Sequence, residues 1–203
     1  MGDIEQLAFD LLSHDELKLV GRLLVLDSNG NAGPLIENIL PIYWVKVDDI
    51  CENHEPTNIY RPLYYVHKYS REGGFKNNTR TLMNSTSNHI EGCLQYLLGL
   101  PAQSRSMSGA FGPAVAKLKE QRVLSSVLAN SLKRFNDVIN VPAKHFGAYA
   151  PTRRLDERTF SDKETVCAII IMRNLSVQLF ALLKTHHVSL PEDWPQFDTN
   201  WFL

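Results

Sequence analysis

Residues 161–184 constrain the fold more than any other part of this sequence. Ser161 and Glu164 have the spacing of a capping box, in which each side chain bonds to the backbone N–H of the other residue at a helix start. The residues that follow place apolar side chains on two stripes at helical spacing, Val166, Ile170, Val177 and Phe180 on one and Leu175, Leu179 and Leu182 on the other. A helix that is apolar around most of its girth has to be surrounded by other elements, so these residues predict the central helix of the fold.

The rest of the chain predicts shorter helices around this centre. Apolar spacing predicts a helix over the first 26 residues, with a restart at a second capping box formed by Ser13 and Glu16. The same criterion predicts helices near residues 34–40, over 81–100 and between 113 and 140. Four to six helices within residues 1–203 predict an all-α fold, a helical bundle in a single domain.

One stretch of about 28 residues, 51–78, interrupts this pattern. It holds Pro56, Pro62, Gly73 and Gly74, which favour turns, so we expect a long irregular insertion in the bundle. Its tyrosines indicate that the insertion packs on another surface (Tyr60, Tyr64, Tyr65 and Tyr69). Residues 43–50 fit either a strand or a helix, and residues 188–203 are predicted to form a C-terminal tail.

The composition restricts which partners and which cellular compartment we expect for this chain. The net charge of −1 gives the whole chain no attraction to nucleic acid or anionic lipid, so a basic patch would have to be built by the fold. The longest apolar run, residues 166–172, is far shorter than the roughly 20 residues of a membrane span, and the N-terminus lacks a signal peptide. The three cysteines are far apart and form no CxxC pair. We therefore expect a cytoplasmic protein with reduced thiols, no membrane partner, no metal site and no cofactor.

The first candidate site lies where a predicted helix breaks. Asn136 and Asn140 are four residues apart and so share one helix face. Pro142 disfavours helical geometry at the residue before it, so the helix should end near Asn140, with Lys144 and His145 just beyond. Paired amides, an amine and an imidazole at a helix end can bind a phosphate or nucleotide, and His145 could transfer a proton near neutral pH. Alternatively, these residues simply cap the helix C-terminus.

The second candidate is Arg173-Asn174 within the central helix. Arg173 falls on the stripe of Val166, Ile170 and Val177, and a charge in a buried stripe has to be paired or face a cavity. It is therefore either an ion pair between helices or a snorkelling side chain, or else part of an anion-binding site.

Other histidines favour structural interpretations. His89 and Glu91 are two residues apart and do not share a helix face, which weakens them as a pair of ligands. Asn88-His89 is predicted to lie at the solvent edge, near the start of its helix. The adjacent His186 and His187 are expected to close the C-terminus of the central helix.

Residues 135–145 (FNDVINVPAKH) and 159–179 (TFSDKETVCAIIIMRNLSVQL) resemble HEPN-type helical domains. In that family a polar helix end is followed by a loop and a central helix that carries an arginine and a small polar residue, here Arg173-Asn174. The resemblance covers the C-terminal half, from His89 onward, and implies binding of RNA or a nucleotide. HEPN ribonucleases also place a histidine four to six residues after the arginine, and here Val177, Gln178, Leu179 and Phe180 stand there instead. The resemblance thus implies a non-catalytic member, or one that uses His145.

Elsewhere in the chain, Arg61 and His67 satisfy the bare arginine–histidine spacing. Because Arg61 precedes Pro62 in a region predicted to be a loop, we treat that match as chance.

Two functional hypotheses follow, and an enzyme acting on a small molecule is a third alternative, since pockets cannot be seen in a sequence. In the first, a HEPN-like protein binds RNA or a nucleotide, with Arg173 and Lys144 on phosphate and with amides that orient groups (Asn136, Asn140 and Asn174). In the second, a non-catalytic interaction or scaffold protein forms a homodimer through the tyrosines of residues 60–69 and the aromatic tail (Trp194, Trp201 and Phe202), because interfaces favour aromatic residues.

Overall fold

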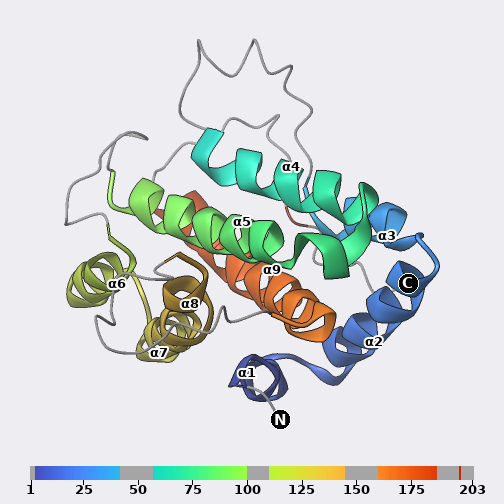
Figure 1. The fold of residues 1–203 in the computed structure, drawn as a ribbon. Coiled ribbons are helices and arrows are strands. Elements are labelled where there is room, and N and C mark those ends of the chain that lie inside the picture. The colour runs from blue at the N-terminus through green and yellow to red at the C-terminus, as the bar shows by residue number, and fades with distance from the viewer. Residues whose placement is uncertain (1–2, 42–56, 100–109, 145–159, 187–196, 198–203) are drawn as a thin grey trace, which may run out of the picture.

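The computed structural model describes residues 3–41, 57–99, 110–144, 160–186 and 197 (Figure 1). Helices account for 85% of these residues and none of them is in a strand, which confirms an all-α helical bundle. The described residues hold nine α-helices and one π-helix, more than the four to six helices predicted from the sequence. The excess arises because predicted long helices are divided by short turns and because one helix was missed altogether.

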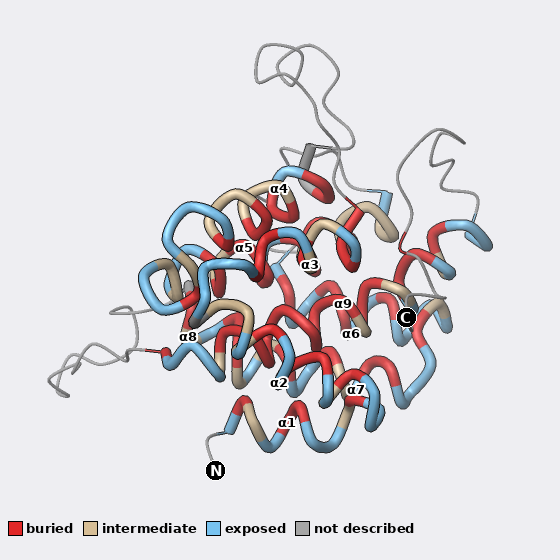
Figure 2. Tube along the Cα trace, turned by 90° about the vertical axis from the view of Figure 1, so that its right-hand side faces the viewer, coloured by how far each residue is buried: buried red, intermediate tan, exposed pale blue. Residues whose placement is uncertain are grey.

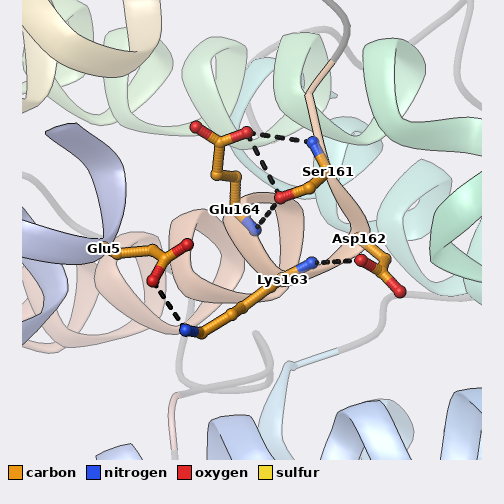
Figure 3. A network of polar contacts seen from close by, with 5 residues as sticks. All are labelled: Glu5, Ser161, Asp162, Lys163 and Glu164. Atoms are coloured by element: carbon orange, nitrogen blue, oxygen red, sulfur yellow. Dashed lines mark hydrogen bonds and ion pairs between the residues drawn. The ribbon is translucent and has the colours of Figure 1, made fainter. Parts of the chain in front are cut away.

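The long helix α9, Asp162–Thr185, lies at the centre of the bundle, as its sequence predicts. Its N-terminus has the expected capping box: Glu164 N donates to Ser161 Oγ at 3.1 Å and Ser161 N donates to Glu164 Oε2 at 2.9 Å (Figure 3). Beside it, Lys163 Nζ lies 2.6 Å from Glu5 Oε2 of α1, Asp3–Leu11. Helix α9 is long and apolar enough to cross a membrane, but 72% of its apolar window is buried inside the protein, so one such helix is weak evidence for a span.

Helix α5, Gly74–Leu97, packs along α9, and α4, Thr57–Arg71, packs along the other side of α5 (Figure 1). The start of α5 is held by α2, His14–Ser28, because Phe75 N donates to Asp27 Oδ1 at 3.0 Å. Gly74 has a φ of 73°, and a Cβ there would lie 2.5 Å from Asp27 Oδ1, so both its conformation and its neighbour require glycine.

The remaining helices cover the edges of this core. Helix α3, Ala32–Ile39, lies against α4, while α6, Phe111–Glu120, and α7, Ser126–Phe135, form a hairpin closed by stacking of Phe111 on Phe135 at 5.8 Å. Figure 2 shows buried residues where helices face each other and exposed residues along the outer side of α1. The capping box at Ser13 is also confirmed, since Glu16 N donates to Ser13 Oγ and Ser13 N donates to Glu16 Oε2.

The expected irregular insertion over residues 51–78 is wrong from residue 57 onward, because α4 and the start of α5 occupy it. Ile59, Leu63 and Val66 are fully buried at spacings of four and three, which is a helical stripe partly hidden by the tyrosines between them. Pro62 is tolerated because it stands early in α4, where its missing N–H costs one bond to the first turn. The prolines and glycines of this stretch favour turns, and they outweighed the helical spacing of these three core residues in the prediction.

The prediction that a helix ends near Asn140 is also wrong. The chain passes from α7 into a π-helix, Asn136–Asn140, and then into the short helix α8, Val141–Lys144. Val141 N donates to Asn136 O, five residues back, and Val141 has helical φ and ψ of −62° and −50°. A wider turn relieves the clash between a proline ring and the carbonyl four residues earlier, so Pro142 is accommodated by a π-turn instead of ending the helix.

Candidate functional site

A cleft of about 350 Å³ lies between α4 and α5. Most of its lining residues have polar side chains, and they come from both helices: Arg61, Pro62 and Tyr65 of α4, and Ser85, Asn88, Glu91, Gly92 and Gln95 of α5. Pockets that hold small ligands are usually about 300–1,000 Å³, so the cleft can hold a group the size of a base with its phosphate.

The α4 wall of the cleft combines a cation with an aromatic ring. Arg61 Nε donates to the Tyr65 hydroxyl at 3.2 Å, and the guanidinium carbon lies 5.7 Å from the centre of that ring. Residues 61 and 65 are four apart, so they share one face of the helix. Arg61 is exposed and Tyr65 is half-buried, which leaves both groups at the protein surface.

The same face of α4 continues as an aromatic and basic row that we call the α4 stripe, formed by Arg61, Tyr64, Tyr65, Lys68 and Tyr69. Ring centres lie 5.7 Å apart for Tyr64–Tyr65 and 6.1 Å apart for Tyr65–Tyr69. Lys68 Nζ lies 5.9 Å from the Tyr69 ring centre and 4.0 Å from a carboxylate oxygen of Glu72. Tyr60 is not part of the stripe, because it is buried and its ring packs edge-on at 6.2 Å from Phe180 of α9.

The α5 wall carries amide, carboxylate and hydroxyl groups. Asn88, Glu91 and Gln95 are three and four residues apart and so line one face of α5. Gly92, which has no side chain, lines the cleft among them. These groups offer both hydrogen-bond donors and acceptors to a ligand.

His89 lies in the core beneath the cleft and connects three helices. The prediction that it lies at the solvent edge of its helix is wrong. His89 is fully buried; its Nδ1 lies 2.6 Å from Ile59 O of α4 and its Nε2 lies 2.8 Å from Ser176 Oγ of α9. Burial lowers the pKa of His89 to about 4, so the ring is neutral near pH 7. A carbonyl only accepts, so Nδ1 carries the ring proton. Nε2 then faces the Ser176 hydroxyl, whose single proton is shared between Nε2 and Met172 O, 2.6 Å from the same oxygen. We call His89, Ile59 O and Ser176 the His89 cluster; it fixes α4 against α5.

The surroundings of His89 argue against nucleophilic chemistry there. Cys93 Sγ lies 3.8 Å from His89 Nε2, but burial raises the pKa of the Cys93 thiol, which keeps it protonated and unreactive. The imidazole is also enclosed by the rings of Phe180 at 6.2 Å and Phe197 at 5.8 Å. The His89 cluster is therefore a structural support for the cleft.

A second buried histidine connects α4 to α3. His67 Nε2 lies 2.8 Å from Glu37 Oε1, and Arg71 Nη1 lies 3.3 Å from the same oxygen. Burial lowers the pKa of His67 despite the nearby carboxylate. Arg61 faces the cleft while His67 faces Glu37, so these two residues with family-like spacing do not form one site.

Asn136 and Asn140 come together as their spacing predicts, but Asn140 faces the core. Asn140 Nδ2 donates to Asn136 Oδ1 at 2.8 Å, and Asn140 Oδ1 accepts from the Ser87 hydroxyl of α5. Asn140 is buried and Asn136 is half-buried, so the pair anchors the π-helix to α5. The side chain of Lys144 and all of His145 lie outside the described residues.

Arg173 is 2% exposed, as its place on the apolar stripe predicts. Its Nε donates to Ile39 O at 3.0 Å, the carbonyl that ends α3. The neighbouring Asn174 Nδ2 donates to Glu16 Oε1 of α2 at 2.9 Å. These bonds lead to α3 and α2, whereas Asn140 bonds to α5, so the two predicted groups of site residues serve different helix contacts. That His145 shares a cavity with Arg173 stays a prediction.

No protein-family model, curated protein or solved structure matches this chain. The case for a function therefore rests on the geometry of the cleft and of the α4 stripe.

Proposed function

We propose that this chain is a HEPN-like helical protein that binds RNA or a nucleotide, and that it does so in the cleft between α4 and α5. The observation that carries the proposal is the lining of that cleft, where Arg61 and Tyr65 face the polar row of α5. The cytoplasmic location predicted from the sequence agrees with such a role and stays part of the proposal.

The phosphate and the base of a nucleotide each have a matching group in the cleft. The Arg61 guanidinium can bond two phosphate oxygens at once, which is the strongest hydrogen-bonding arrangement available to a side chain at this surface. The Tyr65 ring offers a face for stacking of a base. Asn88 can bond a base edge through one donor and one acceptor, and Gln95 lines the same cleft.

Arg173 does not serve as the phosphate contact in this proposal. Its side chain is buried and its Nε is bonded to Ile39 O, so binding a phosphate would first require loss of that bond and opening of the core. Arg61 is exposed and needs no such change. The proposal is limited to binding, since His145, the residue expected to carry any proton transfer, lies outside the described residues.

Calorimetric titration of the whole chain with the four ribonucleoside monophosphates and with a single-stranded hexaribonucleotide tests the proposal. We expect saturable binding, weakened about tenfold or more by Arg61→Ala, because a hydrogen bond to a charged group is worth about 1.5–3 kcal/mol. Arg61→Lys should recover only part of the loss, because lysine lacks the planar fork. Arg22→Ala is the matched control, since Arg22 is equally exposed but belongs to α2. A folded parent chain that binds none of these ligands would contradict the proposal.

The homodimeric scaffold is the second candidate, because tyrosines and arginines at the surface are also typical of protein interfaces. Of the tail, the structure describes only Phe197, which is buried with its ring centre 5.0 Å from that of Phe180. Trp194, Trp201 and Phe202 lie outside the described residues, so their part in an interface stays a prediction. Light scattering separates the two functions. A stable dimer that Tyr65→Ala dissociates, with no nucleotide binding, would favour the scaffold, whereas a monomer that binds nucleotides would favour the first proposal.

A further inference from the structure

The α4 stripe extends past the cleft. Of its members, Arg61 and Tyr65 line the cleft, while Lys68 and Tyr69 stand one turn further along α4 and do not line it. From these positions we infer that the ligand is a single-stranded nucleic acid of several nucleotides, which enters the cleft at Arg61 and runs along α4 to Tyr69. This inference rests on the proposed function and specifies its substrate class.

The spacing of the rings favours an extended strand. The Tyr65 and Tyr69 ring centres lie 6.1 Å apart and their planes are inclined by 32°. This separation is nearly twice the ~3.4 Å that separate stacked neighbours on one strand. Two successive bases can therefore each stack on a ring of their own only if they are drawn apart from one another. Arg61 and Tyr69 are eight residues apart, about 12 Å along the helix, which is more than one nucleotide covers.

The charges along the stripe suit a strand whose phosphates continue beyond the cleft. Lys68 lies next to the Tyr69 ring, so a base on that ring would bring its phosphate close to the ammonium group. The acidic neighbour of Lys68 is Glu72, 4.0 Å away, and both side chains are more than a third exposed. An exposed pair of this kind contributes little stability, so Lys68 can exchange Glu72 for a phosphate at small cost.

The same geometry disfavours a duplex. Stacking on a tyrosine ring requires a base whose face is free, and bases inside a helix are covered by their neighbours. A paired stem could reach the stripe only with its phosphates and would lose the contribution of the rings. We therefore expect a preference for unpaired over paired strands of equal length.

The experiment measures affinity as a function of ligand length and pairing, with uridine monophosphate, a uridine dinucleotide, a uridine hexanucleotide and a hairpin stem as the probes. We expect the hexanucleotide to bind at least tenfold more tightly than the monophosphate and more tightly than the stem, as stacking contributions of bases on aromatic side chains add. Lys68→Ala and Tyr69→Ala should weaken the hexanucleotide about fivefold to tenfold and leave the monophosphate unchanged. Lys119→Ala, an exposed lysine of α6, should change neither.

Two further measurements show whether the effects come from the charge of Lys68 and from the ring of Tyr69. Lys68→Ala removes an exposed side chain and should not unfold the chain, and it should make the salt dependence of hexanucleotide binding shallower by about 0.7 in log–log slope. Tyr69→Phe, which keeps the ring, should bind the hexanucleotide like the parent. Equal affinity for the monophosphate and the hexanucleotide, or insensitivity of both to Lys68→Ala and Tyr69→Ala, would overturn this inference and leave the cleft proposal standing. Absence of binding to every probe would overturn both.

Discussion

Helix α5 carries polar side chains on two different sides, one enclosed by the core and one lining the cleft. On the inner side, His89 bonds to Ile59 O and to Ser176, and all three groups are enclosed by the core. On the outer side, Asn88 is exposed and faces the cleft together with Gln95. Buried polar groups that are bonded within the chain hold helices in place, whereas an exposed polar group that lines a cleft lies where a ligand can reach it. Of these two adjacent residues, His89 supports the fold, and our proposal assigns Asn88 to ligand recognition.

The most severe test of this contrast is His89→Ala. It removes both bonds of the imidazole, leaves Ile59 O and the Ser176 hydroxyl without that partner, and opens a cavity between α4, α5 and α9. We expect the free energy of unfolding to fall by about 3–5 kcal/mol. Chemical denaturation followed by circular dichroism measures this. A loss below about 1 kcal/mol would mean that the His89 cluster does not hold the helices together.

The next test uses pH. The pKa of His89 in the folded chain is about 4, below its ordinary value of 6.5, so the unfolded chain binds more protons in this range. Stability from this group is therefore fully present above about pH 6.5 and is lost as the pH falls toward 4, by about 3 kcal/mol in all. The pKa of His67 is shifted in the same direction and adds to the slope.

Denaturation curves between pH 7 and pH 4 should show this loss, and His89→Gln should flatten the profile without abolishing the part due to His67. An identical pH profile in the parent chain and in His89→Gln would show that His89 does not titrate as its burial requires.

Ser176→Ala is a milder change in the same cluster. The hydroxyl bonds to His89 Nε2 and also to Met172 O at 2.6 Å, and alanine fills nearly the same space. We expect a loss of about 1 kcal/mol, because the hydroxyl has one proton to share between these two acceptors and its removal leaves no large cavity. Combined with His89→Ala, it should add less than its separate effect, since the two share a bond. Strict additivity in this double-mutant cycle would contradict the proposed coupling.

The sequence predicted the centre of this fold better than its candidate site, for a physical reason. In α9 and at its capping box the signals are local: apolar residues at helical spacing and a serine three residues before a glutamate. The burial of His89 depends on Ile59 and Ser176, which are 30 and 87 residues away in sequence. Its neighbours Asn88 and Glu91 are polar, and they suggested a solvent edge. The alignment of His89 with Thr86 and Cys93, both buried, is the signal that could have placed it inside.

Helix α4 and Arg173 show the same limit. The outer face of α4 carries tyrosines and basic residues, so its pattern resembles a loop although Ile59, Leu63 and Val66 form a core stripe. The stripe in α9 correctly predicted that Arg173 is buried. Its partner could not be foreseen, because the Ile39 carbonyl is available only where α3 ends, and that depends on the fold.

Asn88→Ala is expected to have the smallest effect on stability, and it tests the comparison between the two sides of α5 most directly. Asn88 stands next to His89 in sequence, but its side chain is exposed, so its removal should change the free energy of unfolding by no more than about 0.5 kcal/mol. The same substitution should weaken nucleotide binding several-fold, because one donor and one acceptor leave the cleft. Asn130→Ala, at an exposed asparagine of α7, is the matched control and should alter neither quantity.

If Asn88→Ala destabilised the chain like His89→Ala, the two sides of α5 would not be functionally distinct. If it changed neither stability nor binding, α5 would contribute only its inner side, and recognition in the cleft would have to come from Arg61 and Tyr65 alone.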